Sequence, residues 1–349
     1  MSFAKKLLQW FDLHGRKNLP WQHPIEPYRV WLSEIMLQQT QVETVIPYFK
    51  NFLEKFPDIQ SLADADLDQV LHLWTGLGYY ARARNLHKCA RQVIDEYAGV
   101  FPDNTELLET LPGIGRSTAA AIASIAYQQP SAILDGNVKR VLARYHATAG
   151  WPGKSEVANT LWQHAEQHMP KKRCRDYTQA IMDLGATLCT RSRPACSICP
   201  LNAGCLAHQQ GNPADYPGKK PKKILPVKTV QMLILKNAKG EISLHQRPPT
   251  GIWGGLWSFP ELETEVNAKA HIEQHFGSVK QLDKWDTMRH TFSHYHLDII
   301  PVLAQIGEKQ LAENKHVVQE GAKQLWYNTH SPAAIGLAAP VKKLLSKLI

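Results

Sequence analysis

Four cysteines gathered in one short stretch are the residues of this chain best suited to chemistry. They follow the spacing C-x6-C-x2-C-x5-C, which differs from the paired C-x2-C motifs of a structural zinc site. Four thiolates from one compact loop suit a cubane iron–sulfur cluster, while a zinc loop or two tight disulfides are the alternatives. With 6 cysteines in 349 residues, the chain has too few for a disulfide scaffold. The four are Cys189, Cys196, Cys199 and Cys205.

A turn with two glycines offers a second site, one suited to binding an anion. Gly113 and Gly115 lie between a helix expected over about 104–110 and an alanine-rich helix that starts after Gly115. Glycines two residues apart let the backbone approach a ligand, and free N–H groups at the next helix start favour a phosphate. The pattern predicts a helix–hairpin–helix over about 104–125 that grips nucleic acid, and an ordinary Pro-Gly turn is the alternative.

Two acidic residues each have an ordinary and a chemical interpretation. Asp135 precedes a helical run, so it is expected to be an N-cap, which contributes on the order of 1 kcal/mol. The two apolar residues before it also suggest a carboxylate that is partly buried. Glu34 is expected near the end of a helix that begins at Pro27, beside an irregular junction at 37–40. Its ordinary role would be a solvated partner for a lysine.

Two kinds of structure must position these residues. Residues 1–208 show helical periodicity with Gly and Pro stops, including a helix expected to start at Thr40 through a capping box with Glu43. A basic linker rich in proline and glycine follows over 209–224 and is expected to be exposed. Residues 225–349 combine short apolar strands with a few helices, which predicts an α+β domain.

Charge and hydropathy restrict the partner and the compartment. The chain has 40 Lys and Arg against 31 Asp and Glu, a net charge of +9, which favours a polyanionic partner such as nucleic acid. The first residues lack the apolar core of a signal peptide, and no run reaches the ~20 apolar residues of a membrane span. We therefore expect a soluble, cytoplasmic chain without a membrane partner.

In this order, the residues resemble a known family. A helix–hairpin–helix, then an Asp, then the four-cysteine loop is the pattern of the endonuclease III-like DNA glycosylase superfamily. Within it, the chain closely resembles the MutY-type adenine DNA glycosylases over essentially its whole length. The segments that carry this resemblance are Pro20-Trp21, 31–42, 73–84 and 134–141.

The resemblance implies an architecture and a substrate. The expected architecture is a mostly α glycosylase domain over 1–208, with a 4Fe-4S cluster in the loop 189–205, followed by an α+β Nudix-like domain over 225–349. The expected substrate is double-stranded DNA with adenine opposite 8-oxoguanine or guanine, repaired by base excision. The acting species is expected to be a monomer.

The resemblance also assigns roles to single residues. It makes Glu34 the acid that protonates adenine at N7, and Asp135 the carboxylate that offsets the positive charge growing on the sugar. Glu34 must then keep a proton near neutral pH, so we expect it to be buried with a raised pKa. The adenine must also leave the duplex, and other residues must fill the gap. The further residues implied to act are Gln39 and Tyr79 in that gap, Gly113, Gly115 and Asn137 at the DNA, and Trp21 beside the base pocket.

Two further positions set the subclass and the role of the C-terminal domain. Superfamily members that also cut the strand carry a Lys where this chain has Ser117, and that amine forms a Schiff base. We therefore expect hydrolysis by water, with Lys139 as a candidate for a stray nucleophile. Residues 254–261 resemble the start of a Nudix motif whose acidic metal-binding helix is missing, which predicts recognition in place of pyrophosphatase chemistry. The loop implied to contact 8-oxoguanine is Phe292, Ser293 and His294.

Three rival functions stay open at this point. The first is a bifunctional glycosylase/lyase for oxidised pyrimidines, against which Ser117 and the C-terminal domain argue. The second is a DNA-damage sensor without catalysis, against which the presence of both Glu34 and Asp135 argues. The third, a Nudix pyrophosphatase, is disfavoured by the missing acidic helix.

Overall fold

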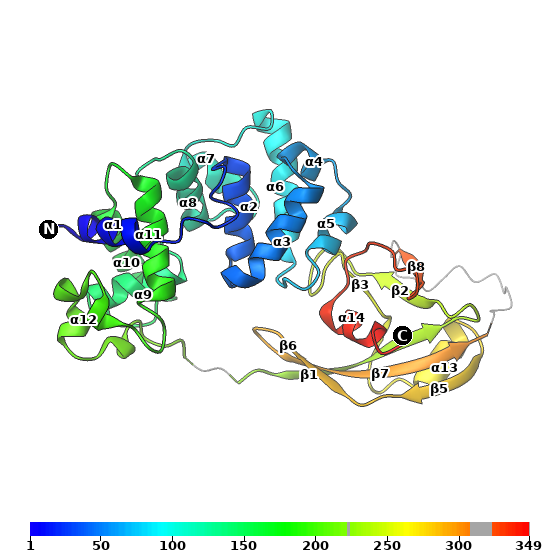
Figure 1. Cartoon of the computed structure of the whole chain (residues 1–349). Helices are drawn as coiled ribbons and strands as arrows, with labels where there is room; N and C mark the ends of the chain where they lie inside the picture. The colour runs from blue at the N-terminus through cyan, green and yellow to red at the C-terminus, as the bar shows by residue number, and fades with distance from the viewer. Residues whose placement is uncertain (222–223, 308–322, 349) are drawn as a thin grey trace. The chain divides into compact units, whose positions relative to one another are not determined.

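One segment of the N-terminal half folds with the C-terminal half. The computed structural model describes residues 1–221, 224–307 and 323–348, and it divides into two compact units (Figure 1). The sequence-based boundaries 1–208, 209–224 and 225–349 stay a prediction, and residues 222 and 223 of that linker lie outside the described residues. The units consist of Met1–Asp64 with Asn85–Lys222, and of Ala65–Arg84 with Lys223–Ile349.

The first unit is built from helices around α11 (Cys174–Thr187). This helix packs against α1 (Phe3–His14), α8 (Arg116–Ala126) and α9 (Gly136–Tyr145). In α8 the mostly small side chains of 119–125 are all buried, which lets neighbouring helices approach closely. None of the helices in the described part of the chain combines the length and the apolar composition that a bilayer span requires. The other helices are α2 (Pro27–Leu37), α3 (Val42–Lys55), α4 (Ile59–Ala63), α6 (Ala81–Tyr97), α7 (Thr105–Thr110), α10 (Ser155–His168) and α12 (Leu206–Gln209), with 3-10 turns at Cys196–Ile198, Asn202–Gly204 and Pro213–Asp215.

Local sequence signals place one helix start correctly and misplace another. α2 begins at Pro27, where the missing N–H of proline leaves no helical bond unmade. The expected capping box of Thr40 with Glu43 is wrong, because Gln41 is the N-cap of α3 and no side chain caps that helix. The Thr40 hydroxyl instead donates to the carbonyl of Gln38, at 3.4 Å.

The second unit confirms the predicted α+β domain. At its centre, β1 (Val227–Lys236) runs parallel to β7 (His296–Ile306) and antiparallel to β2 (Ile242–Gln246). The remaining elements are α5 (Leu67–Leu73), β3 (Trp257–Ser258), β4 (Glu261–Leu262), α13 (Ala268–His275), β5 (Val279–Lys284), β6 (Met288–Thr291), β8 (Gln324–Tyr327) and α14 (Ala339–Leu345). Among the described residues the sheet order is β3-β2-β1-β7-β5, with β4 beside β1, β6 beside β7 and β8 beside β2.

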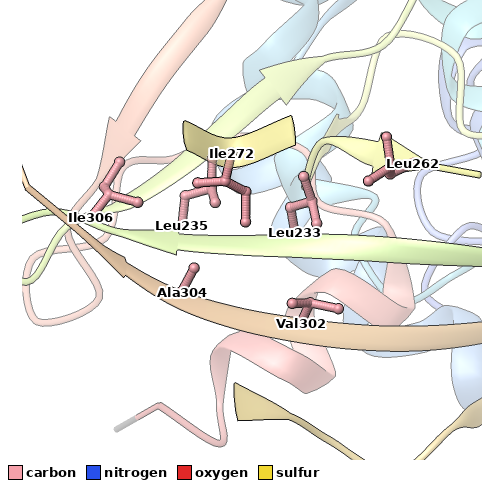
Figure 2. Close-up of a cluster of buried hydrophobic side chains, with 7 residues drawn as sticks. All are labelled: Leu233, Leu235, Leu262, Ile272, Val302, Ala304 and Ile306. Carbon is pink, nitrogen blue, oxygen red and sulfur yellow. The ribbon is translucent and has the colours of Figure 1, made fainter. Parts of the chain in front are cut away.

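An apolar cluster holds α13 against this sheet (Figure 2). Leu233 and Leu235 of β1 gather with Ile272 of α13, and all three are fully buried. β1 is buried at five successive residues, 231–235, the pattern of a strand covered on both faces. The cluster therefore fixes the central strands that carry the loops described below. Its other members are Leu262, Val302, Ala304 and Ile306.

Candidate active site

Glu34 lies one turn before the end of α2. Its neighbours Ser33 and Ile35 are buried, and its own side chain keeps only part of its solvent exposure. Burial, together with the negative charge of Asp135, raises the pKa of Glu34 to about 7. The raised pKa expected from the sequence is therefore present, the side chain is partly buried, and it can hold a proton at neutral pH.

Asp135 is the N-cap of α9. One carboxylate oxygen accepts the Val138 N–H at 2.7 Å, and the other accepts from the amide of Asn137 at 3.4 Å. Burial raises the pKa of Asp135, while these hydrogen bonds and the charge of Arg140 act in the opposite direction. The ordinary N-cap interpretation is confirmed, and the same carboxylate is near enough to shift the pKa of Glu34.

These two carboxyl groups can divide acid and electrostatic work between them. A pKa of about 7 lets Glu34 donate a proton at neutral pH. The hydrogen bonds that Asp135 accepts at a helix N-terminus favour its ionised form and act against the burial that raises its pKa. A protonated carboxyl that senses the charge of a nearby carboxylate is the arrangement used to cleave glycosidic bonds.

Ser117 holds the segment that leads to Asp135. Its hydroxyl accepts the Leu134 N–H at 3.0 Å, which fixes the backbone one residue before the carboxylate. The sequence analysis singled out this position because strand-cutting relatives carry a lysine there. It did not predict the hydrogen bond between Ser117 and Leu134. Ser117 and Leu134 are 17 residues apart in the sequence, so no local sequence pattern predicts their contact.

The backbone requires glycine at only one of the two hairpin positions. Gly113 has a φ of +82°, and a Cβ there would lie 2.9 Å from the Cβ of Asn85. Gly115 has open space where a Cβ would point, and it forms the N-cap of α8 without a side-chain cap. α7 and α8 flank both glycines, so the helix–hairpin–helix lies where it was predicted. Its grip on phosphate stays a prediction.

Both residues expected to fill the gap of a flipped base have a left-handed backbone. φ is +59° at Gln39 and +49° at Tyr79, a conformation that costs a non-glycine residue about 1 kcal/mol. Gln39 is exposed, and Tyr79 is 52% exposed with Arg82 above its ring. Strain of this kind persists only where the surrounding structure imposes it, and it is found often at functional sites. Trp21, in contrast, is 6% exposed and packs edge-on against Phe49, as a core residue does.

The four cysteines line one pocket in the loop after α11. All are free thiols, which leaves the two-disulfide interpretation without support. Within the described residues, no group of three or more His, Cys, Asp or Glu side chains is placed to hold a single metal ion. The pocket is also lined by Arg144, whose Nη1 lies 3.3 Å from the sulfur of Cys189.

Two arginines of α9 anchor this loop. Arg144, only 2% exposed, donates to two loop carbonyls at 2.7 and 3.0 Å. Arg140 donates to the Cys189 carbonyl at 2.7 Å and to the amide oxygen of Asn137 at 2.8 Å. Asn137, expected at the DNA, thus bridges Arg140 and Asp135. Sequence reasoning missed both arginines as anchors, although two arginines four residues apart on the helix after Asp135 were a visible signal.

The residues expected to read the opposite base form the tip of a hairpin between β6 and β7. The Phe292 N–H donates to the Tyr295 carbonyl at 2.9 Å and closes the turn. Ser293 and His294 are exposed at the tip, whereas Phe292 is half-buried and Tyr295 is buried. The turn therefore exposes two polar side chains, with the aromatic rings of Phe292 and Tyr295 packed beneath them.

Comparison with known proteins agrees with this geometry. Residues 32–167 match the HhH-GPD superfamily of base excision DNA repair proteins, and residues 231–347 match the NUDIX domain. The adenine DNA glycosylase of Buchnera aphidicola subsp. Baizongia pistaciae is 38% identical, over 100% of this chain and 97% of its own length. That of Homo sapiens is 34% identical, over 97% of this chain and 72% of its own length.

Solved structures show the same fold for the helical part. A thermostable thymine-DNA glycosylase superposes with a TM-score of 0.55 at 28% identity, covering 60% of this chain and 95% of its own. Endonuclease III in a non-covalent DNA complex superposes with a TM-score of 0.51 at 23% identity, covering 60% and 94%, which supports the fold alone. With near-complete coverage by its relatives, the chain belongs to the adenine DNA glycosylases, which join a helix–hairpin–helix domain to a Nudix domain.

Proposed function

We propose that this chain removes adenine paired with 8-oxoguanine or guanine in double-stranded DNA by hydrolysing the N-glycosidic bond. The observation that carries the proposal is the pair of Glu34 and Asp135, in which burial and the neighbouring charge raise the pKa of Glu34 to about 7. The relatives, which are adenine DNA glycosylases, support adenine as the excised base.

In the proposed mechanism, Glu34 acts first as an acid and then as a base, while Asp135 acts through its charge. Glu34 donates its proton to N7 of the flipped adenine and makes the base a better leaving group. Asp135, ionised, offsets the positive charge that grows on the sugar as the bond breaks, and water then adds to the sugar. Glu34, now ionised, takes up a proton from that water. Gln39 and Tyr79 fill the gap in the duplex, and the hairpin at 113–115 binds a phosphate.

Serine at position 117 favours hydrolysis over strand cleavage. An alcohol cannot form the imine on which a lyase step depends, and the hydroxyl of Ser117 is already bonded to the Leu134 N–H. Lys139, on α9, is the competing amine. A bifunctional glycosylase/lyase is therefore the second candidate function.

A single-turnover assay separates these functions. A duplex with one A:8-oxoguanine pair is incubated with excess protein, and each sample is divided between hot alkali and no treatment. We expect strand breaks only after alkali, and no covalent complex with borohydride. Breaks without alkali would show a lyase step, and intact DNA with tight binding would show a damage sensor.

We further propose that the cysteine loop holds a 4Fe-4S cluster. Four thiols line one pocket, and buried Arg144 lies against Cys189, where its positive charge would balance thiolates. When bound, the cluster would fix the shape of the loop. A redox role is not needed for the reaction, because glycosidic hydrolysis transfers no electrons. The residues that would hold it are Cys189, Cys196, Cys199 and Cys205.

Metal analysis tests this cofactor. Protein purified without oxygen is expected to contain about four iron and four sulfide per chain, because a cubane cluster has that composition. Cys199→Ser should lower the iron content sharply and weaken DNA binding. Cys89→Ala, which removes a buried thiol elsewhere, serves as the control and should keep the iron. Stoichiometric zinc in place of iron and sulfide would contradict the cluster.

The C-terminal domain is proposed to recognise the base opposite adenine. The helix α13 has one acidic residue, Glu273, where a Nudix hydrolase needs several carboxylates for Mg²⁺. The exposed tip formed by Ser293 and His294 supplies polar groups that suit base recognition.

A further inference from the structure

The hairpin tip at 292–294 is supported by a cluster of aromatic rings, formed by Trp253, His290, Phe292 and Tyr295. The ring centre of Trp253 lies 5.2 Å from that of Phe292 and 5.4 Å from that of His290. The rings of Phe292 and His290 meet edge to face at 4.6 Å, and Tyr295 packs on Phe292 at 4.8 Å. Because Trp253 is only 8% exposed, it forms a buried base beneath the exposed tip.

Trp253 is itself fixed by its own loop. Its φ of +55° is an outlier for a bulky residue and persists only where surrounding contacts impose it. The guanidinium of Arg247 lies 5.7 Å from the centre of the indole, and its Nε donates to the Ile252 carbonyl at 3.0 Å. Arg247 also forms an ion pair with Glu261. The indole therefore cannot turn away from the hairpin without breaking these contacts.

The same loop is bonded to the segment that carries Tyr79. Arg84, in the first turn of α6, donates to the carbonyl of Gly254 at 2.8 Å, one residue after Trp253. Arg82, from the same turn, lies 5.5 Å from the ring centre of Tyr79 and donates to backbone carbonyls of 77 and 78. One turn of helix thus contacts both Tyr79 and the loop.

A second connection strengthens this link. The amide of Gln246 donates to Asp68 at 3.1 Å and to the Gly255 carbonyl at 3.3 Å. Asp68 belongs to α5, in the same segment as Tyr79, and it also accepts from the indole N–H of Trp257 at 3.4 Å. The loop 247–255 is therefore bonded on one side to residues 65–84 and packed on the other against the hairpin.

We infer that the loop 247–255, through Trp253, fixes the distance between Tyr79 and the hairpin tip and so sets the preference for adenine opposite 8-oxoguanine over adenine opposite guanine. This inference rests on the proposed function, in which Tyr79 enters the duplex and 292–294 reads the opposite base. Two groups that hold the same base pair must keep a fixed spacing, since a shift of about 1 Å costs up to 10²-fold in rate. Trp253 is thus a positioning residue that touches neither base.

The test compares single-turnover excision from A:8-oxoguanine and A:G duplexes. In Trp253→Ala, the ratio of the A:8-oxoguanine rate to the A:G rate should fall about tenfold, toward the ratio of His294→Ala. The A:G rate itself should stay within about twofold of wild type. Trp253→Phe, which keeps a ring, should restore most of the ratio. Trp285→Ala is the matched control, because Trp285 lies in the same unit and outside the aromatic cluster, under Lys347. The imidazole proton resonances of His290 and His294 report the position of the hairpin independently.

Each result has a distinct meaning. Moved resonances and a lower ratio in Trp253→Ala, with neither in Trp285→Ala, would support the inference. An unchanged ratio in Trp253→Ala, with His294→Ala impaired, would overturn the inference and leave the proposed function standing. An equal fall with both substrates would also overturn it, since that is what simple destabilisation produces. Wild-type protein without any preference would overturn the recognition role and the inference together.

Discussion

The Glu34→Gln protein is expected to bind a duplex with an A:8-oxoguanine pair and to release adenine far more slowly than wild type. The amide keeps the shape of the carboxyl group but has no proton to donate, so the excision rate should fall by about 10²–10⁴-fold. Wild-type excision should decline as the pH rises above about 7, where Glu34 loses its proton. Single-turnover rates between pH 5 and 9 measure both effects. A Glu34→Gln rate within tenfold of wild type would remove this residue from the acid role.

The same substitution should stabilise the folded chain in alkaline solution. The folded state keeps the Glu34 proton up to a pKa of about 7, whereas the unfolded chain releases it near 4.5. Stability is therefore lost as the pH rises between these values, by about 3 kcal/mol in total. Glutamine does not titrate, so the variant should match wild type near pH 4.5 and unfold at a higher temperature at pH 8. Equal midpoints at pH 8 would show that Glu34 carries no burial penalty.

Asp135→Asn should separate the two functions of that residue. Asparagine caps a helix as well as aspartate does, so α9 should stay folded. A neutral amide cannot offset the charge on the sugar, and excision should fall by about 10²–10³-fold. Loss of the charge also removes one cause of the raised Glu34 pKa, so the alkaline decline of the remaining activity should move to lower pH.

The pH profile is the decisive measurement for Asp135→Asn. A decline at the same pH as in wild type would show that the two carboxyl groups do not interact. Asp135→Ala is the control that loses the helix cap as well as the charge. Its free energy of unfolding should be about 1 kcal/mol lower than that of Asp135→Asn. A similar loss of thermal stability in both variants would mean that Asn137 or another group supplies the cap.

Local patterns predicted the parts of the site that depend on neighbouring residues. The N-cap at Asp135, the glycine hairpin and the single cysteine pocket each follow from spacing within one short segment. The same reasoning failed at Thr40, where the letters of a capping box are present but the chain turns one residue later and Gln41 becomes the N-cap. Sequence letters do not show which of two adjacent residues takes the extended conformation of a cap.

Long-range hydrogen bonds account for what the sequence could not predict. Ser117 bonds a residue 17 positions away, and Arg84 bonds a carbonyl 170 positions away. Such contacts impose no periodicity, so neither the support of Asp135 nor the grouping of 65–84 with the C-terminal half could be read from the letters. The positive φ of Trp253 is equally invisible, because its tertiary contacts override the local preference of the residue.

The left-handed backbones at Gln39 and Tyr79 create a trade-off between thermal stability and repair activity. Glycine would adopt either conformation without strain, so a library selected only for heat resistance would be drawn to these two positions. Each replacement that it retained would remove a side chain that we propose enters the duplex. Improved thermal tolerance and faithful excision would then evolve in opposite directions, and the order in which a laboratory applies the two selections would decide which property survives.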